Sequence, residues 1–269
     1  MKLPDDVGDV QAWVDEQSEL AAARFSKVVG EIVVAGVERY SKTLTAAGDI
    51  GALDPFDELF GRFMAAEFGE YLATMHLAGA AAASLTLPGA VPPSVMAGWL
   101  DVVNESAVVY QGSATNRIVG ASADMFQDVR DRTVASVQSG ESVDKLAEEV
   151  QAITGYAEGR AAAIARTETI GAFNGGEMEG ARALAEYGPT HKEWSAALDR
   201  RTREDHAFAD GQVVPIDEPF VVGGELMDRP VDPAGSAANV VNCRCTVLFL
   251  YPGDVGAERV IPLGDGPTS

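Results

Sequence analysis

The sequence predicts an α+β protein in which a mainly α-helical N-terminal part is followed by a small α+β C-terminal domain. Two observations predict this class. Over roughly the first 165 residues, apolar side chains recur at the three- and four-residue spacing of amphipathic helices. Beyond Gly188-Pro189 the apolar segments become short and alternate with polar residues, and glycine and proline become frequent, as in strands and turns.

Composition is that of a globular protein with an acidic surface. The 269 residues are 46% hydrophobic and carry a formal net charge of −21, with both halves acidic. This balance disfavours a broad basic surface for duplex nucleic acid. The two cysteines form a single Cys-x-Cys, which makes no disulfide framework, and the N-terminus lacks the basic and apolar regions of a secretory signal. We therefore expect the chain to be cytoplasmic in origin.

Capping and breaking residues divide the helical part into segments. Gly48 and Gly51 are expected to end the first helix, and Asp54-Pro55 is expected to cap and begin the second. Prolines 88, 92 and 93 indicate a loop. The helices expected in order cover residues 10–47, 55–78, 94–110, 114–137, a short segment opening at Ser142, and 158–187.

The most apolar segment, Leu77 to Val91, contains glycines and a proline. It is shorter than the roughly 20 residues that a membrane-spanning helix needs. We therefore expect no stable membrane insertion.

The C-terminal part is expected to hold four strands and one short helix. The strands are expected at residues 193–195, 211–214, 219–222 and 245–251, and the helix at 199–208. We predict a helical partner-docking region over residues 1–157, a compact α+β domain over 158–252, and a flexible tail over 253–269.

An ordered series of short motifs runs through the second half of the chain. The series reads Ala165-Arg166-Thr167-Glu168, Asn174-Gly175, Trp194, Asp199-Arg200-Arg201-Thr202-Arg203 with His206, Asp210-Gly211-Gln212, Pro219-Phe220, Gly224-Glu225-Leu226, Pro230-Val231-Asp232-Pro233 and Asn242-Cys243-Arg244-Cys245. It resembles the C-terminal domain of phage Mu protein F-like head-morphogenesis (minor capsid) proteins, over roughly the last hundred residues.

The resemblance implies a virion component rather than a metabolic enzyme. Such proteins are low-copy capsid components that associate with the portal vertex and act in head assembly, DNA packaging or DNA delivery. The implied partners are phage portal and capsid proteins, with local contact to packaged DNA. The implied location is the virion, in the capsid interior or at the portal vertex, and the host cytoplasm during assembly. No Gly-rich phosphate loop, nucleophile elbow or His-Glu-x-x-His is found, so no catalytic residue is expected.

His206, Cys243 and Cys245 are the candidate metal ligands, because thiolates and a neutral imidazole suit zinc. A fourth ligand would come from His191, Asp199, Asp210 or water. The alternative, which we favour at this point, places one cysteine in the core and one on the surface of a strand, with His206 in a local hydrogen bond. No cofactor is therefore expected, with zinc left open.

The resemblance does not itself carry a metal across to this chain. Some family members have Cys-x-x-Cys where this chain has Arg203-x-x-His206, and His-Pro where it has Val241-Asn242. Those members resemble zinc binders, whereas this chain offers a smaller ligand set.

Arg200, Arg201 and Arg203 form a tight basic cluster and are the candidate contacts to a partner or to DNA phosphate. The favoured alternative is pairing within the molecule, to Asp199, Glu204 or Asp205. Arg244 is expected to anchor a carboxylate such as that of Asp232.

Two other functions remain as alternatives. A nuclease or ADP-ribosyltransferase-like activity would centre on Arg203, Glu168 and His206, because domains of this type can be joined to toxin-like modules; we expect no such module after Cys245. A nucleic-acid-binding module would use the three arginines. The working mechanism is partner binding, with the acidic surface limiting adhesion to packaged DNA.

Overall fold

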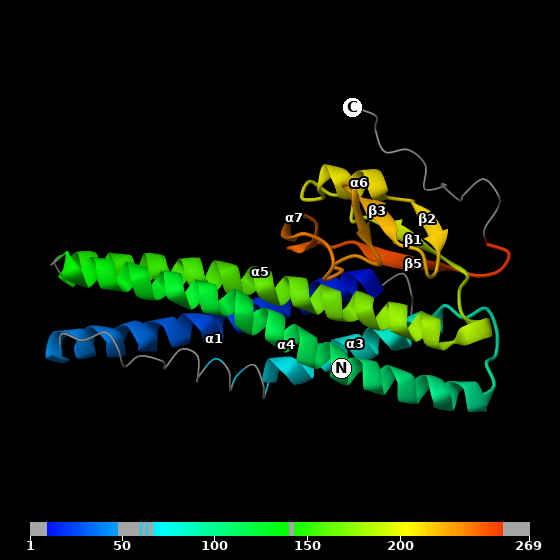
Figure 1. Ribbon diagram of the computed structural model, residues 1–269, viewed down its shortest axis with the longest axis horizontal. Helices are drawn as coiled ribbons and strands as arrows, with labels where there is room; N and C mark the ends of the chain where they lie inside the picture. The colour runs from blue at the N-terminus through cyan, green and yellow to red at the C-terminus, as the bar shows by residue number, and fades with distance from the viewer. Residues whose placement is uncertain (1–9, 48–59, 61–62, 64–66, 140–142, 255–269) are drawn as a thin grey trace. The chain divides into compact units, whose positions relative to one another are not determined.

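The computed structural model describes residues 10–47, 60, 63, 67–139 and 143–254. Its long helices are α1 (Val10–Ala47), α3 (Gly69–Leu85), α4 (Pro93–Gln138) and α5 (Val143–Ala183), followed by a short 3₁₀ helix, η3 (Ala185–Tyr187). Short strands and helices follow, as Figure 1 shows. The α+β class with a helical N-terminal part is therefore confirmed.

Two pairs of expected helices are single helices, so the expected breaks were wrong. α4 continues through Gly112, and α5 continues through Gly155 and Gly159. A glycine within a helix costs only about 1 kcal/mol relative to alanine, so burial of the side chains on either side can outweigh it. The expected start of the second helix, at Asp54-Pro55, lies outside the described residues, and α3 itself continues to Leu85.

The chain divides into two units. One unit comprises Met1–Ser18, Tyr71–Gln111 and Thr167–Ser269, and the other comprises Glu19–Glu70 and Gly112–Arg166. The predicted division at residue 158 stays a prediction.

Within the second unit, aromatic rings form the core. The Phe25 ring stacks on Phe68 with centroids 4.8 Å apart, and the Phe60 ring meets Phe126 edge-on at 5.2 Å. Arg166, which belongs to the first motif of the series and lies on α5, pairs with Glu19 at 2.9 Å in this unit.

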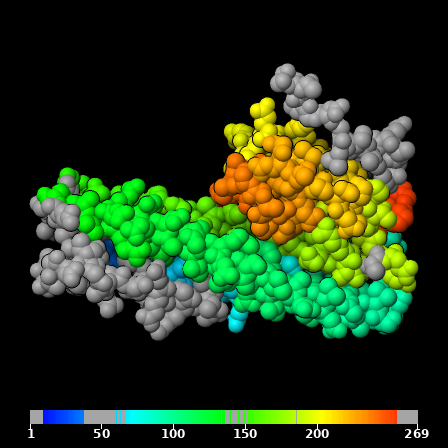
Figure 2. Space-filling model, in the orientation of Figure 1, coloured from blue at the N-terminus to red at the C-terminus, as the bar shows by residue number. Residues whose placement is uncertain are grey.

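Within the first unit, two small sheets make the C-terminal module. β2 (Val213–Pro215), β1 (His191–Ser195) and β5 (Thr246–Leu250) form an antiparallel sheet in that order, with Trp194 opposite Val247. β3 (Phe220–Val222) and β4 (Glu225–Met227) form a hairpin. In Figure 2 these residues, coloured yellow to orange, gather in one body over the C-terminal part of α5.

The module contains two elements that the alternation pattern did not predict, β4 and the short helix α7 (Ala237–Val240). β4 exists because Gly223 and Gly224 both take positive φ, at 57° and 80°, which is the backbone of a two-residue hairpin turn. Each strand of the hairpin has only three residues, too few for an alternating pattern to stand out.

Helices α3 and α5 approach each other closely in the same unit. A Cβ atom at Gly176 would overlap the carbonyl oxygen of His76, and one at Gly79 would overlap that of Phe173. The Trp99 indole on α4 donates to the Gly180 carbonyl at 2.8 Å. Glycine is therefore required on α5 for backbone-to-backbone packing. Within the described residues, no helix is long and apolar enough to cross a membrane.

Candidate metal centre

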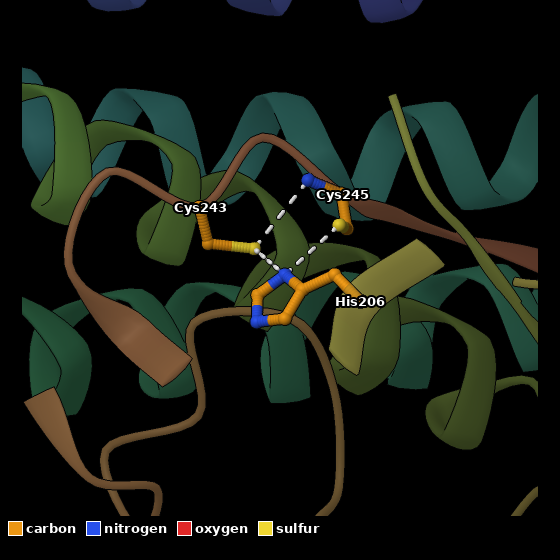
Figure 3. A group of neighbouring side chains, drawn as sticks. All are labelled: His206, Cys243 and Cys245. Carbon is orange, nitrogen blue, oxygen red and sulfur yellow. Dashed lines mark hydrogen bonds between the residues drawn. The ribbon is translucent and has the colours of Figure 1, made fainter. Parts of the chain in front are cut away.

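Three candidate metal ligands converge inside the C-terminal module. His206 lies on α6 (Glu204–Ala209), and Cys243 and Cys245 lie on the segment that leads into β5. His206 Nδ1 lies 3.4 Å from Cys245 Sγ and 3.5 Å from Cys243 Sγ, and the ligand atoms all lie within 4.8 Å of one another. Figure 3 shows the imidazole turned toward both sulfurs.

Helix α5 positions the cysteine segment. The Asn174 side-chain amide donates to the Cys245 carbonyl at 3.1 Å, and the Asn242 backbone N–H donates to Thr167 Oγ1 at 3.0 Å. Asn242 has φ of 56°, a conformation that asparagine tolerates better than most residues. The chain therefore turns sharply just before Cys243 and directs both sulfurs toward α6.

The environment of the two thiols differs from the sequence expectation. Both cysteines are buried, so the expected alternation of one core and one surface cysteine is wrong. Residues two apart on an extended segment point to the same side, so Cys243 and Cys245 both face His206, and the expectation misapplied the period of a strand. A hydrogen bond from the Cys245 thiol, together with His206, holds the pKa of Cys243 well below its usual value. The hydrogen bond with Cys243 and burial raise the pKa of the Cys245 thiol.

The three expected sources of a fourth protein ligand have other partners. Asp199 accepts from Arg244 at 2.5 Å, Asp210 accepts from the Ala196 N–H at 2.8 Å, and His191 contacts Thr190 Oγ1 at 3.1 Å. Among the described residues, the cluster of candidate ligand atoms contains His206, Cys243 and Cys245 alone.

The arginine cluster lies on a turn rather than on the expected helix over residues 199–208. Asp199 Oδ1 accepts from the Arg201 N–H at 2.8 Å, and the Asp199 N–H donates to Thr202 Oγ1 at 3.0 Å. These local bonds compete with helical ones, so α6 begins only at Glu204.

Arg201 and Arg203 both have partners within the molecule. Arg203 donates to the Val241 carbonyl, and Arg201 lies 3.8 Å from Asp199. Arg244 pairs with Asp199, so the expected partner Asp232 is wrong. Asp232 instead accepts backbone N–H groups, including that of Ala234 at 2.9 Å.

A pocket opens beside the three candidate ligands. Its lining includes His206, Cys243 and Cys245 together with Arg201 and Arg203. Glu168 belongs neither to this lining nor to the ligand cluster, so the described structure does not join it to His206 as an acid/base pair.

Sequence patterns did not indicate a buried ion-pair cluster below the sheet. Lys192 on β1 is fully buried, and its Nζ lies 2.6 Å from Asp228 Oδ1. Arg182 on α5 donates to the same carboxylate at 2.7 Å and 3.0 Å. Lys192 occupies an inward position of an alternating strand, where an apolar residue would be expected. This cluster joins α5, β1 and the segment after β4.

Glu177 on α5 is a second buried residue with an ionisable side chain that the sequence did not single out. Burial raises its pKa to about 8, although a hydrogen bond from Thr246 Oγ1 at 3.2 Å opposes the shift. The folded protein therefore binds a proton here that the unfolded chain releases above its ordinary pKa of about 4.3. Stability must fall as pH rises through this window and level off above the folded pKa.

We predict that Glu177→Gln removes this pH dependence. Relative to the variant, the wild-type chain should lose up to about 1.4 kcal/mol of unfolding free energy per pH unit between about pH 5 and 8. Urea unfolding across this range measures the difference, and Glu186→Gln, at an exposed site on η3, is the control. Parallel curves for wild type and Glu177→Gln would contradict the assignment.

Comparison with known proteins bears on the same part of the chain. Residues 127–248 match the family model described as Phage Mu protein F like protein. The chain is 31% identical over 134 residues to minor head protein GP7 of Bacillus phage SPP1, covering 49% of this chain and 43% of that protein.

A second relative is named for an enzymatic activity. The chain is 30% identical over 131 residues to NAD(+)–arginine ADP-ribosyltransferase EFV of Enterococcus faecalis, covering 48% of this chain and 27% of that protein. The chain thus matches less than half the length of either curated relative. No solved structure matches the chain.

The matched segment contains the candidate ligands, the arginine cluster and the whole motif series from Ala165 to Cys245. The resemblance predicted from those motifs is therefore confirmed over this range. Over residues 127–248, the chain is therefore similar to the Phage Mu protein F-like family.

Proposed function

We propose that the chain is a phage minor head protein that acts by binding other head proteins rather than by catalysis. The observation that carries this proposal is the 31% identity to a minor head protein over 134 residues, together with the family match. More specifically, we propose that it associates with the portal vertex, with portal and capsid proteins as partners, and acts in head assembly, DNA packaging or DNA delivery.

An exposed apolar surface on α4 supports a protein-binding role. Val102 and Val109, two turns apart on one side of the helix, are 47% and 64% exposed, and the adjacent Val108 is 68% exposed. Neighbouring large apolar side chains in water are typical of protein interaction sites. The net charge of −21 opposes non-specific adhesion to packaged DNA, so the partner that fits this surface is a protein.

The proposal is tested by locating the chain in particles. We expect the chain to copurify with intact heads at low copy number and to give density at the portal vertex in asymmetric cryo-electron microscopy reconstructions. A Val108→Asp, Val109→Asp variant should be incorporated at reduced levels, because charge at the apolar surface opposes docking. Leu226→Asp, at an exposed apolar position on β4 and outside α4, is the matched control.

Absence of the wild-type chain from purified heads would contradict the proposal. The transferase relative defines the alternative outcome to look for in that case. Its match covers 27% of the transferase, and the chain shares a similar length of sequence with a head protein, so the shared segment is not specific to ADP-ribosylation. A chain that is missing from heads but transfers ADP-ribose from NAD⁺ to an arginine substrate would establish the enzymatic alternative instead.

A further inference from the structure

We propose that His206, Cys243 and Cys245 bind one zinc ion whose fourth coordination position opens to the arginine-lined pocket and takes an exchangeable ligand, water or a small anion. The inference does not depend on the role of the chain in the phage head. It assigns a binding site and a class of ligand to three residues whose convergence hydrogen bonding alone accounts for poorly.

The spacing of the three ligand atoms fits a single central ion. With Zn–S near 2.3 Å and Zn–N near 2.0–2.1 Å, tetrahedral geometry places an imidazole nitrogen about 3.6 Å from each thiolate sulfur. His206 Nδ1 lies 3.4 Å and 3.5 Å from the two sulfurs, close to that value. These two nitrogen-to-sulfur distances therefore need little adjustment to admit the metal, and the two sulfurs lie within 4.8 Å of each other.

Hydrogen bonding alone accounts poorly for the same arrangement. A ring nitrogen has one in-plane direction for a hydrogen bond, yet two sulfurs lie at similar distances from His206 Nδ1. A central cation satisfies all three atoms at once. It also balances the charge, because two thiolates and one neutral imidazole around Zn²⁺ give a net charge of zero in a buried site.

The fourth coordination position is open because, among the described residues, only three side chains offer ligand atoms to the site. Structural zinc sites have four protein ligands, whereas a site with three keeps a position for water or another ligand. Here Asp199 is held by Arg244, and the remaining side of the cluster is the pocket, which Arg201 and Arg203 also line. Positive side chains next to the open position favour an anion there.

One feature of the imidazole sets the expected strength of the site. His206 Nε2 is buried and lacks a hydrogen-bond partner among the described residues, whereas a metal-bound histidine usually donates from its second nitrogen. The ring is oriented instead by edge-on contact with Trp194, at a centroid distance of 5.6 Å. We therefore expect zinc to bind more weakly than at a closed four-ligand site.

The first test measures the metal on the full-length chain. Purified protein titrated with Zn²⁺ should bind one equivalent, and the Co²⁺ form should show the visible absorption of a tetrahedral ion and a thiolate-to-cobalt charge-transfer band. Cys243→Ser and His206→Ala should lose stoichiometric binding, whereas His191→Ala should keep it, because His191 lies outside the cluster. Circular dichroism of each variant checks that it folds. A folded wild-type chain that binds no metal would overturn the proposal, as would unchanged binding in a folded His206→Ala variant.

The second test examines the open position. Adding azide or inorganic phosphate to the Co²⁺ form should change its visible spectrum, because an anion replaces water in the coordination sphere. Arg201→Ala should raise the anion concentration needed for half the change by roughly tenfold, the loss of about one charge-assisted hydrogen bond. A tetrahedral cobalt spectrum that no added anion alters would overturn the open position and indicate a closed site.

Discussion

Replacing Gly176 by alanine should lower the free energy of unfolding by about 3 kcal/mol, one of the two largest effects that we expect from a single substitution in the chain. The added Cβ would overlap the His76 carbonyl oxygen on α3. Because the obstacle is backbone rather than the end of a flexible side chain, the two helices must separate to admit the methyl group. Thermal and urea unfolding, followed by circular dichroism, measure the loss.

Gly159→Ala is the matched control for this experiment. Gly159 also lies inside α5, but a Cβ atom there would meet nothing within 4 Å. This substitution should stabilise the chain by about 0.5–1 kcal/mol, because alanine restricts the unfolded chain and favours the helix. If both alanine variants behaved alike, the close packing of α3 on α5 would be wrong.

These two glycines also show why the helical part could be predicted only in outline. Apolar periodicity predicted that the first part of the chain is helical, and the bounds of α1 agree with it. Periodicity does not distinguish a glycine that ends a helix from one that lets two helices touch. Gly176 and Gly159 look alike in the sequence, and only the position of α3 makes the difference between them.

The candidate metal centre was predictable in its members but not in its geometry. The Cys-x-Cys pair and His206 stood out because of residue type and motif order. Both cysteines face inward because residues two apart on an extended segment share one side, a period that the expected core-and-surface arrangement misapplied. That this side is the one toward His206 depends on the turn at Asn242, whose φ of 56° the sequence did not predict. The arginine turn was missed for a similar reason, since Asp199 and Thr202 stabilise it through side-chain bonds to the backbone.

The buried ion-pair cluster lay beyond sequence reasoning altogether. Lys192, Arg182 and Asp228 come from three separate segments, and no spacing rule connects them. A charged residue at an inward strand position is unexpected in a sequence unless its partner is known.

The cluster leads to the second large effect, which we expect from Asp228→Asn. Burial opposes ionisation of Asp228, but hydrogen bonds from Arg182 and Lys192 outweigh it and hold the pKa of this carboxyl below its usual value. Asp228 is therefore charged at neutral pH, where it compensates the Lys192 ammonium. The amide would leave that fully buried ammonium without its hydrogen-bonded counter-charge.

We expect Asp228→Asn to lower the free energy of unfolding by about 3 kcal/mol, the low end for breaking a buried pair, because the Asp228 side chain is itself 33% exposed. Lys192→Met separates this charge effect from a loss of packing. The methionine fills a similar volume, and Asp228 keeps Arg182 at 2.7 Å, so that variant should lie within about 1 kcal/mol of wild type. Urea unfolding at neutral pH compares the two. Equal losses in both variants would mean that the cluster contributes through shape, whereas a large loss in Asp228→Asn alone would identify an uncompensated lysine charge as the cause.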